Sequence, residues 1–220
     1  MNGFVLAGGK SSRMGSDKAL LELDGHPLID IALGKVRALG MQPQICGSRP
    51  DLTKYAPAIP DNFPDRGPLG GIEAALTVSE SEGNLFVPTD LPLLPVEFLA
   101  WIASRAEATG AVATIPIFGG RYQPLCGAYS RRLLAGLRFS LASGDFKVMT
   151  AITTAAAALQ EPIDAFCVES VAAALMPRSW PAELPMQEWF RNLNSPEDYV
   201  FLRTMAGHDA AGANRRDPIS

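Results

Sequence analysis

The apolar residues of this chain form two alternating patterns. Short apolar runs, typical of strands buried on both faces, occur at residues 4–7, 44–46, 58–60 and 84–88. Segments with apolar residues at helical spacing occur at residues 27–39, 68–80, 95–108, 130–142, 147–159 and 196–205. Strands that alternate with helices predict an α/β fold with three layers, in which a mostly parallel, Rossmann-like sheet carries helices on both faces.

The pattern changes after residue 110. Residues 111–118 and 123–129 are strand-like and are joined by Gly119-Gly120-Arg121, and a Gly-Gly pair supplies the positive φ that a hairpin turn requires. We therefore expect an antiparallel hairpin region here. Further strands are predicted at residues 166–168 and 189–193.

Composition narrows the classes of function. The 220 residues carry a net charge of −4, which argues against a nucleic-acid or anionic-membrane partner because either favours a basic surface. No apolar run approaches the length of a membrane span, and no basic, apolar leader precedes the first strand, so we expect a cytoplasmic protein. The three cysteines are single and widely spaced, which predicts neither a disulfide framework nor a metal site. The two histidines lie in no constellation with Ser or Cys, so a catalytic triad is excluded.

Chemistry-bearing residues follow the predicted strands. Gly8 and Gly9 follow the first strand, Asp61 the third and Asp90 the fourth. Ligands of parallel α/β sheets bind beyond the carboxyl ends of the strands. These residues are therefore expected along one edge of the sheet.

The glycine loop, residues 8–18, delivers Lys10, Arg13 and Lys18 directly after two glycines. It is not a Walker A loop, because the leading glycine of that motif falls at Phe4, and it is not a dinucleotide fingerprint, because its next glycine is Gly15. Backbone amides freed by glycines form a nest for anions, an arginine forks across phosphate oxygens, and a lysine follows charge that develops at phosphorus. The loop predicts a nucleoside triphosphate site, with a solvated basic loop as the alternative.

The loop closely resembles a nucleotidyltransferase signature through Leu6-Ala7-Gly8-Gly9-x-Ser11-x-Arg13-Met14-Gly15-x-x-Lys18. Other stretches resemble motifs of the molybdenum cofactor guanylyltransferases, in the right order: Gly67-Pro68-Leu69-Gly70-Gly71, Pro88-Thr89-Asp90-Leu91-Pro92, Arg121-x-x-Pro124, Lys147-Val148-Met149 and Asn192-Leu193-Asn194-Ser195-Pro196-Glu197-Asp198. The resemblance covers about residues 5–202, and only residues 161–187 look unmatched.

That resemblance implies a glycosyltransferase-A-like nucleotide-diphospho-sugar transferase fold. It implies transfer of GMP from GTP to the phosphate of molybdopterin, with release of pyrophosphate and dependence on Mg²⁺. Arg13, Lys18 and Asp90 are the implied catalytic residues, and Asp90 is the implied metal ligand. A carboxylate at a strand end suits Mg²⁺, although an Asp that caps the following turn is the alternative.

The implied nucleotide-binding residues are Leu6, Ala7, Gly8, Gly9, Lys18, Asp61 and Asp90. Asp61 corresponds to a family aspartate that binds ribose or assists the metal, and a turn residue is the alternative. Relatives with Gly at position 8 use guanine and those with Ala use cytosine, so Gly8 favours GTP by resemblance. Family members commonly carry an Asn where this chain has Cys46-Gly47-Ser48, so the chain departs from the family pattern at this contact.

Acceptor-binding roles are implied for Arg121, Lys147, Asn192 and Asn194. A hairpin-tip Arg, a solvated Lys and an Asn that caps the next helix are the structural alternatives. The prediction is one nucleotidyltransferase domain over residues 1–206, with a nucleotide half at about 1–110 and an acceptor half at about 111–206, followed by a disordered tail at 207–220.

Three other functions stay open: a cytidylyltransferase, a sugar-phosphate nucleotidyltransferase of the same fold, and a nucleotide-binding regulator without activity. The expected partners are GTP and molybdopterin. Transient contacts with other proteins of molybdenum cofactor synthesis, or with target apoenzymes, are a further expectation.

Overall fold

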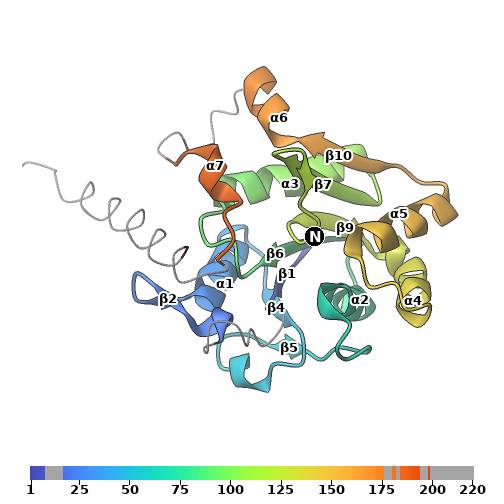
Figure 1. The fold of residues 1–220 in the computed structure, drawn as a ribbon, viewed down its shortest axis with the longest axis horizontal. Helices are drawn as coiled ribbons and strands as arrows, with labels where there is room; N and C mark the ends of the chain where they lie inside the picture. Colours follow the sequence, from blue (N-terminus) through green and yellow to red (C-terminus); the bar gives the residue numbers. More distant parts are fainter. Residues whose placement is uncertain (8–16, 176–179, 182–183, 194–197, 199–220) are drawn as a thin grey trace, which may run out of the picture.

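A computed structural model describes residues 1–7, 17–175, 180–181, 184–193 and 198 (Figure 1). The helix predicted at residues 196–205 and the tail predicted at 207–220 lie outside this part, apart from Asp198.

An eight-stranded sheet forms the centre of the structure, in the order β10-β7-β9-β6-β1-β4-β5, with β8 paired to β7. The strands are β1 (Asn2–Leu6), β4 (Pro43–Cys46), β5 (Ala58–Ile59), β6 (Gly83–Pro88), β7 (Ala113–Phe118), β8 (Arg121–Tyr122), β9 (Gly127–Ser130) and β10 (Ile163–Cys167). β1 runs parallel to β4 and β6, whereas β9 is antiparallel to both β6 and β7. The mostly parallel sheet with an antiparallel region is confirmed.

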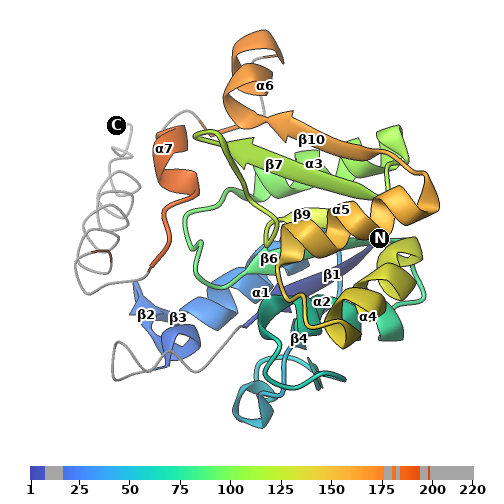
Figure 2. The same cartoon turned by 45° about the vertical axis from the view of Figure 1, so that its right-hand side comes forward.

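Helices cover both faces of the sheet, as Figure 2 shows. They are α1 (Leu28–Ala38), α2 (Gly67–Val78), α3 (Val96–Thr109), α4 (Leu134–Ala142), α5 (Val148–Leu159), α6 (Val168–Leu175) and α7 (Met186–Trp189). Alternation along the strands divides the core: Val5 and Val87 pack with α1 and α3, whereas Phe4 and Phe86 pack with α2, α4 and α5. The three layers are therefore confirmed.

Short elements follow β1 in the chain. They are the 3₁₀ helix η2 (Lys18–Leu20) and the small hairpin of β2 (Glu22–Leu23) and β3 (His26–Pro27). Two further 3₁₀ helices are η3 (Pro50–Leu52) and η4 (Arg131–Leu133).

The strand predicted at residues 189–193 is wrong. Trp189 ends helix α7, and Trp189 and Phe190 pack on Phe98 of α3 with ring centroids 5.4 and 5.6 Å apart. Aromatic residues favour strands locally, but this tertiary cluster buries them from a helical turn.

The strand predicted at residues 123–129 divides into β8 and β9. Gly119 and Gly120 form the predicted turn with φ of +55° and +70°, and β8 ends where Gln123 donates to the Pro116 carbonyl at 2.8 Å. Pro124 has no amide proton, so the ladder stops and a turn leads into β9.

The three cysteines are free thiols, with Cys46 and Cys126 buried and Cys167 half-buried. Within the described ranges, no helix has both the length and the apolar character that a membrane span requires.

Candidate active site

The ends of β1 and β6 are joined to one another. Leu6 ends β1, and its carbonyl accepts hydrogen bonds from the Thr89 amide at 3.2 Å and the Thr89 hydroxyl at 3.3 Å. Leu6 and Ala7 are buried. Asp90, the residue after Thr89, therefore lies beside the point where the chain enters the glycine loop.

Asp90 and Lys18 interact electrostatically. Burial raises the pKa of the Asp90 carboxyl above its usual value, and the positive charge of Lys18 acts in the opposite direction. Lys18 begins η2, and the Asp17 side chain caps this helix by accepting the Ala19 amide at 3.0 Å. Two of the three predicted catalytic residues are thus brought together at the carboxyl edge of the sheet.

Lys35 of α1 contacts the turn that follows Asp90. Its ammonium group donates to the carbonyls of Leu91, at 3.3 Å, and Pro92. Burial lowers the pKa of Lys35 to about 7. The main chain that follows Asp90 is held by a lysine that the sequence analysis did not single out.

The segment predicted to bind the acceptor also contacts Asp90. The Leu193 amide donates to the Asp90 carbonyl at 3.0 Å, and the Leu193 side chain is buried against Leu23 and Leu28. Asn192 is therefore held one residue away from this anchor, with its own side chain exposed.

Asp61 follows β5 and faces the first turn of α2. Its Oδ1 atom is buried and has no hydrogen-bond partner within the described part of the chain. Burial, with the nearby charges of Asp65 and Glu73, raises the pKa of Asp61. A Cβ added to Gly71 of α2 would lie 3.2 Å from the Cys46 Cβ and 3.8 Å from Asp61 Oδ1, so a glycine lets α2 approach the strand ends closely.

Arg121 and Lys147 both have exposed side chains. Arg121 belongs to β8, and Lys147 precedes α5, next to Phe146, whose ring lies 4.5 Å below the Arg66 guanidinium. No hydrogen bond or ion pair links either residue to Asp90 in the described ranges. The predicted site residues Gly8, Gly9, Arg13 and Asn194 lie outside the described residues.

A family model for the MobA-like NTP transferase domain matches residues 3–161, well over half of the chain. The chain belongs to the MobA-like NTP transferase family. The match contains every predicted site residue except Asn192 and Asn194.

Curated relatives of this MobA-like NTP transferase are named as molybdenum cofactor guanylyltransferases. A probable enzyme of this name from Carboxydothermus hydrogenoformans is 30% identical over 202 residues, which cover 90% of this chain and 92% of that protein. The enzyme of this name from Vibrio cholerae is 34% identical over 149 residues, which cover 66% of this chain and 73% of that protein. The resemblance seen in the sequence is confirmed.

Solved structures share the fold. The molybdopterin-guanine dinucleotide biosynthesis protein A of Archaeoglobus fulgidus superposes with a TM-score of 0.76 at 22% identity, covering 94% of this chain and 100% of that one. The 2-C-methyl-D-erythritol 4-phosphate cytidylyltransferase of Thermus thermophilus gives 0.62 at 14% identity, covering 93% and 98%. At these identities the likeness bears on the fold alone, and it confirms the predicted fold class.

Two cations of this MobA-like NTP transferase escaped the sequence analysis. Lys35 lies in a helical segment whose neighbours Leu33 and Val36 are buried, and a lysine beside core positions is a weak signal for a supporting role. Arg49 comes three residues after β4, at the strand-end position that drew attention to Asp61 and Asp90. Its position after a parallel strand was the sequence signal that could have identified Arg49.

Proposed function

We propose that this protein transfers GMP from GTP to the phosphate of molybdopterin, forming a guanine dinucleotide cofactor and pyrophosphate. The observation that carries the proposal is the half-buried Asp90 carboxylate beside Lys18, at the strand end next to the glycine loop. The names of the curated relatives support the guanylyl group and the acceptor.

We propose Mg²⁺ as the metal and Asp90 as its protein ligand. The raised pKa of Asp90 indicates that the protein alone does not fully compensate its buried charge, which suits a carboxylate that meets a cation. Mg²⁺ takes one or two carboxylates and completes its shell with water and phosphate oxygens. This is compatible with the absence, among the described residues, of any group of three or more metal-ligating side chains. When bound, the ion neutralises charge on the triphosphate.

In the proposed reaction an oxygen of the acceptor phosphate attacks the α-phosphorus of GTP, a new P–O bond forms, and the bond to the pyrophosphate breaks in line. Such transfers depend on alignment and on charge neutralisation. Lys18 would follow the charge that grows at the α-phosphate, together with Arg13 in the glycine loop.

The acceptor would approach along the segment anchored by Leu193 on Asp90, where Asn192 and Asn194 recognise the pterin. Arg121 and Lys147 would hold the acceptor phosphate. The unpartnered Oδ1 atom of Asp61 makes it our candidate for binding ribose or for a second contact with the metal.

Gly8 is our proposed determinant of guanine, with Leu6, Ala7 and Gly9 completing the wall of the nucleotide site. We further propose one domain over residues 1–206, with nucleotide and acceptor halves that meet near residue 110. The cytoplasmic location and the transient protein contacts expected from the sequence stay predictions.

The test combines the protein with Mg²⁺, molybdopterin and each of GTP, CTP, ATP and UTP. We expect pyrophosphate release and a dinucleotide product with GTP, and the largest thermal stabilisation by GTP with Mg²⁺. Faster reaction and stronger stabilisation with CTP would identify a cytidylyltransferase instead. Binding of GTP without pyrophosphate release would indicate a regulator.

A further inference from the structure

Arg49 is a buried arginine whose guanidinium contacts three separate segments. The residue is 7% exposed. Its Nη1 lies 3.5 Å from the Ala7 carbonyl oxygen, its Nη2 donates to the Asp17 carboxylate, and its Nε and Nη2 lie 3.0 and 2.7 Å from the two carboxylate oxygens of Asp51. One planar group therefore joins the residue after β1, the N-cap of η2 and the 3₁₀ helix η3.

Two of these contacts lie at the two ends of the glycine loop. Ala7 immediately precedes the loop, and Asp17 is its last residue but one. A guanidinium is rigid, with its donors in one plane, so contacts to both positions define how far apart the two ends of the loop lie.

Asp51 holds the guanidinium from the other side. The bidentate contact with Asp51 orients the group, and hydrogen bonding to Asp51 raises the pKa of Arg49 above its usual value. The cation is thus permanently charged and fixed before any nucleotide binds.

The contact with Asp17 also reaches Lys18. One oxygen of Asp17 accepts from Arg49, and the other accepts the Ala19 amide at 3.0 Å, which caps the helix that begins with Lys18. Through Asp17, the position of Arg49 is coupled to that of the lysine beside Asp90.

A second arginine shows what an ion pair with a structural role looks like here. Arg105 of α3 makes a bidentate contact with Asp164 of β10, at 2.7 and 2.8 Å, and lies over the rings of Trp101 and Phe166. It joins a helix to an edge strand and touches none of the predicted site residues that the structure describes. The two arginines share their chemistry and differ in what they connect.

We propose that Arg49 is a positioning residue of the nucleotide site, which holds both ends of the glycine loop and, through Asp17, the Lys18 ammonium at the separation that the reaction needs. This role rests on the proposed function, because it assumes that the loop binds the triphosphate. Small displacements of reacting groups lower rates steeply, so loss of this contact should act on catalysis beyond its effect on folding.

The test compares Arg49→Met and Arg49→Lys with the matched control Arg105→Met in the full-length protein. We expect both Arg49 variants to lose about 10- to 100-fold in kcat/KM for GTP, the order of a small misplacement of reacting groups. Arg105→Met should lower Tm and leave kcat/KM within about twofold of the unmodified protein, which is the effect of a purely structural pair. Arg49→Lys keeps the positive charge and loses the planar set of guanidinium donors. It replaces Arg49→Met in the test if that variant does not fold.

A double-mutant cycle with Asp17→Asn adds a readout that a purely structural role would not move. If Arg49 acts through Asp17, the double variant loses little more kcat/KM than either single variant. Additive losses in the cycle, or unchanged kcat/KM in both Arg49 variants, overturn the proposal.

Trypsin digestion keeps this test separate from the proposed function. Lys10 and Arg13 are cleavage sites within the loop. We expect faster cleavage at these two positions in the Arg49 variants than in Arg105→Met, even if no nucleotide is transferred. Equal cleavage rates would overturn the role of Arg49, whereas absent transfer with faster cleavage would overturn only the guanylyltransferase assignment.

Discussion

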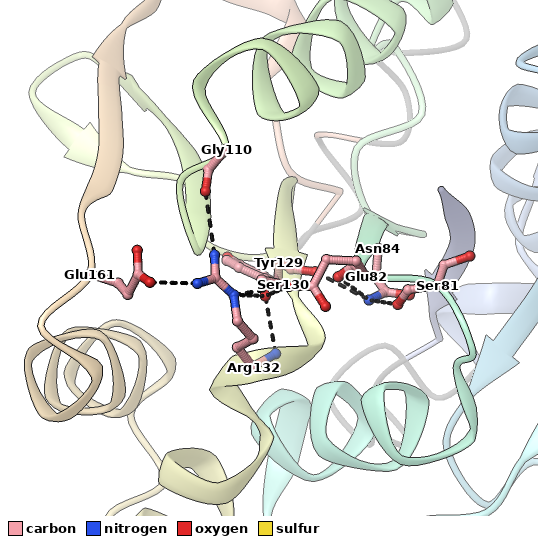
Figure 3. A network of polar contacts seen from close by, with 8 residues as sticks. All are labelled: Ser81, Glu82, Asn84, Gly110, Tyr129, Ser130, Arg132 and Glu161. Carbon is pink, nitrogen blue, oxygen red and sulfur yellow. Dashed lines mark hydrogen bonds and ion pairs between the residues drawn. The ribbon is translucent and has the colours of Figure 1, made fainter.

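The central sheet has an amino edge, where β1 and β6 begin, and a carboxyl edge, where they end. The two edges differ in how fully the protein compensates their charged and polar groups. At the amino edge, shown in Figure 3, Arg132 donates to Glu82, Glu161 and the Gly110 carbonyl. Asn84 is fully buried there and donates to the carbonyls of Ser81, Glu82 and Tyr129 at 3.2, 3.3 and 3.2 Å. The donors and acceptors of this edge satisfy one another.

The carboxyl edge keeps charges that the protein compensates only partly. Burial raises the pKa of Asp90 and Asp61, and burial lowers the pKa of Lys35 to about 7. Each shift means that the folded protein disfavours the charged form of the group. Perturbed groups of this kind gather at functional sites, where a ligand or metal supplies the missing charge.

From this comparison we infer that the amino edge stabilises the fold and that the carboxyl edge serves the proposed chemistry. Changes at the amino edge should lower stability and spare activity. Changes at the carboxyl edge should lower activity and spare stability.

The largest expected effect belongs to Asp90→Asn. If Asp90 holds the metal as proposed, the variant should lower guanylyl transfer by about 10³-fold or more, because a bound metal ion supplies several kcal/mol to such a reaction. Without metal, Tm should stay the same or rise, since a partly buried charge is removed. Rate assays and thermal melts measure both effects, and an active variant would remove Asp90 from the mechanism.

Asn84→Ala should give the opposite result at the other edge. The change removes a fully buried side chain and its three donated hydrogen bonds, although the Glu82 carbonyl keeps the Arg131 amide and the Ser81 carbonyl keeps the Ser79 hydroxyl. We expect a loss of about 3 kcal/mol, or roughly 6–12 °C in Tm, with kcat/KM unchanged at 25 °C. Urea melts and initial rates test this, and a large loss of activity in the folded variant would contradict the division between the edges.

Lys35 should make stability depend on pH. Its pKa is about 7 when folded and 10.5 when unfolded, so between these values the unfolded chain binds one more proton and stability rises with pH. From pH 7.5 to 9 the protein should gain about 2 kcal/mol relative to Lys35→Met. Denaturant melts of both proteins at the two pH values test this, and an unchanged difference would contradict the burial of the ammonium group.

The smallest effect is expected for Gly120→Ala in the β7–β8 turn. Gly120 has φ of +70°, where alanine is strained by about 1 kcal/mol. If neighbouring Arg121 binds the acceptor, the variant should raise KM for molybdopterin and leave KM for GTP unchanged. Equal changes in both KM values would argue against the acceptor role of Arg121.

The sequence by itself determined the order of strands and helices and the residues that follow each strand. Asp61 and Asp90 were found this way because burial of a strand leaves a local apolar pattern and because parallel strands end at the same edge. The same local reasoning failed at Trp189, where packing against Phe98 overrides strand propensity, and at Pro124, where a missing amide divides the predicted strand.

Only the tertiary structure decided which charges meet. Arg49 is 42 residues from Ala7 and 32 from Asp17, and Lys35 is 57 residues from Pro92, so no local periodicity links these partners. Their contacts arise because crossover connections return distant segments to neighbouring strand ends. The chemistry of the strand ends was thus readable residue by residue, whereas the groups that hold them in place became visible only once the sheet was assembled.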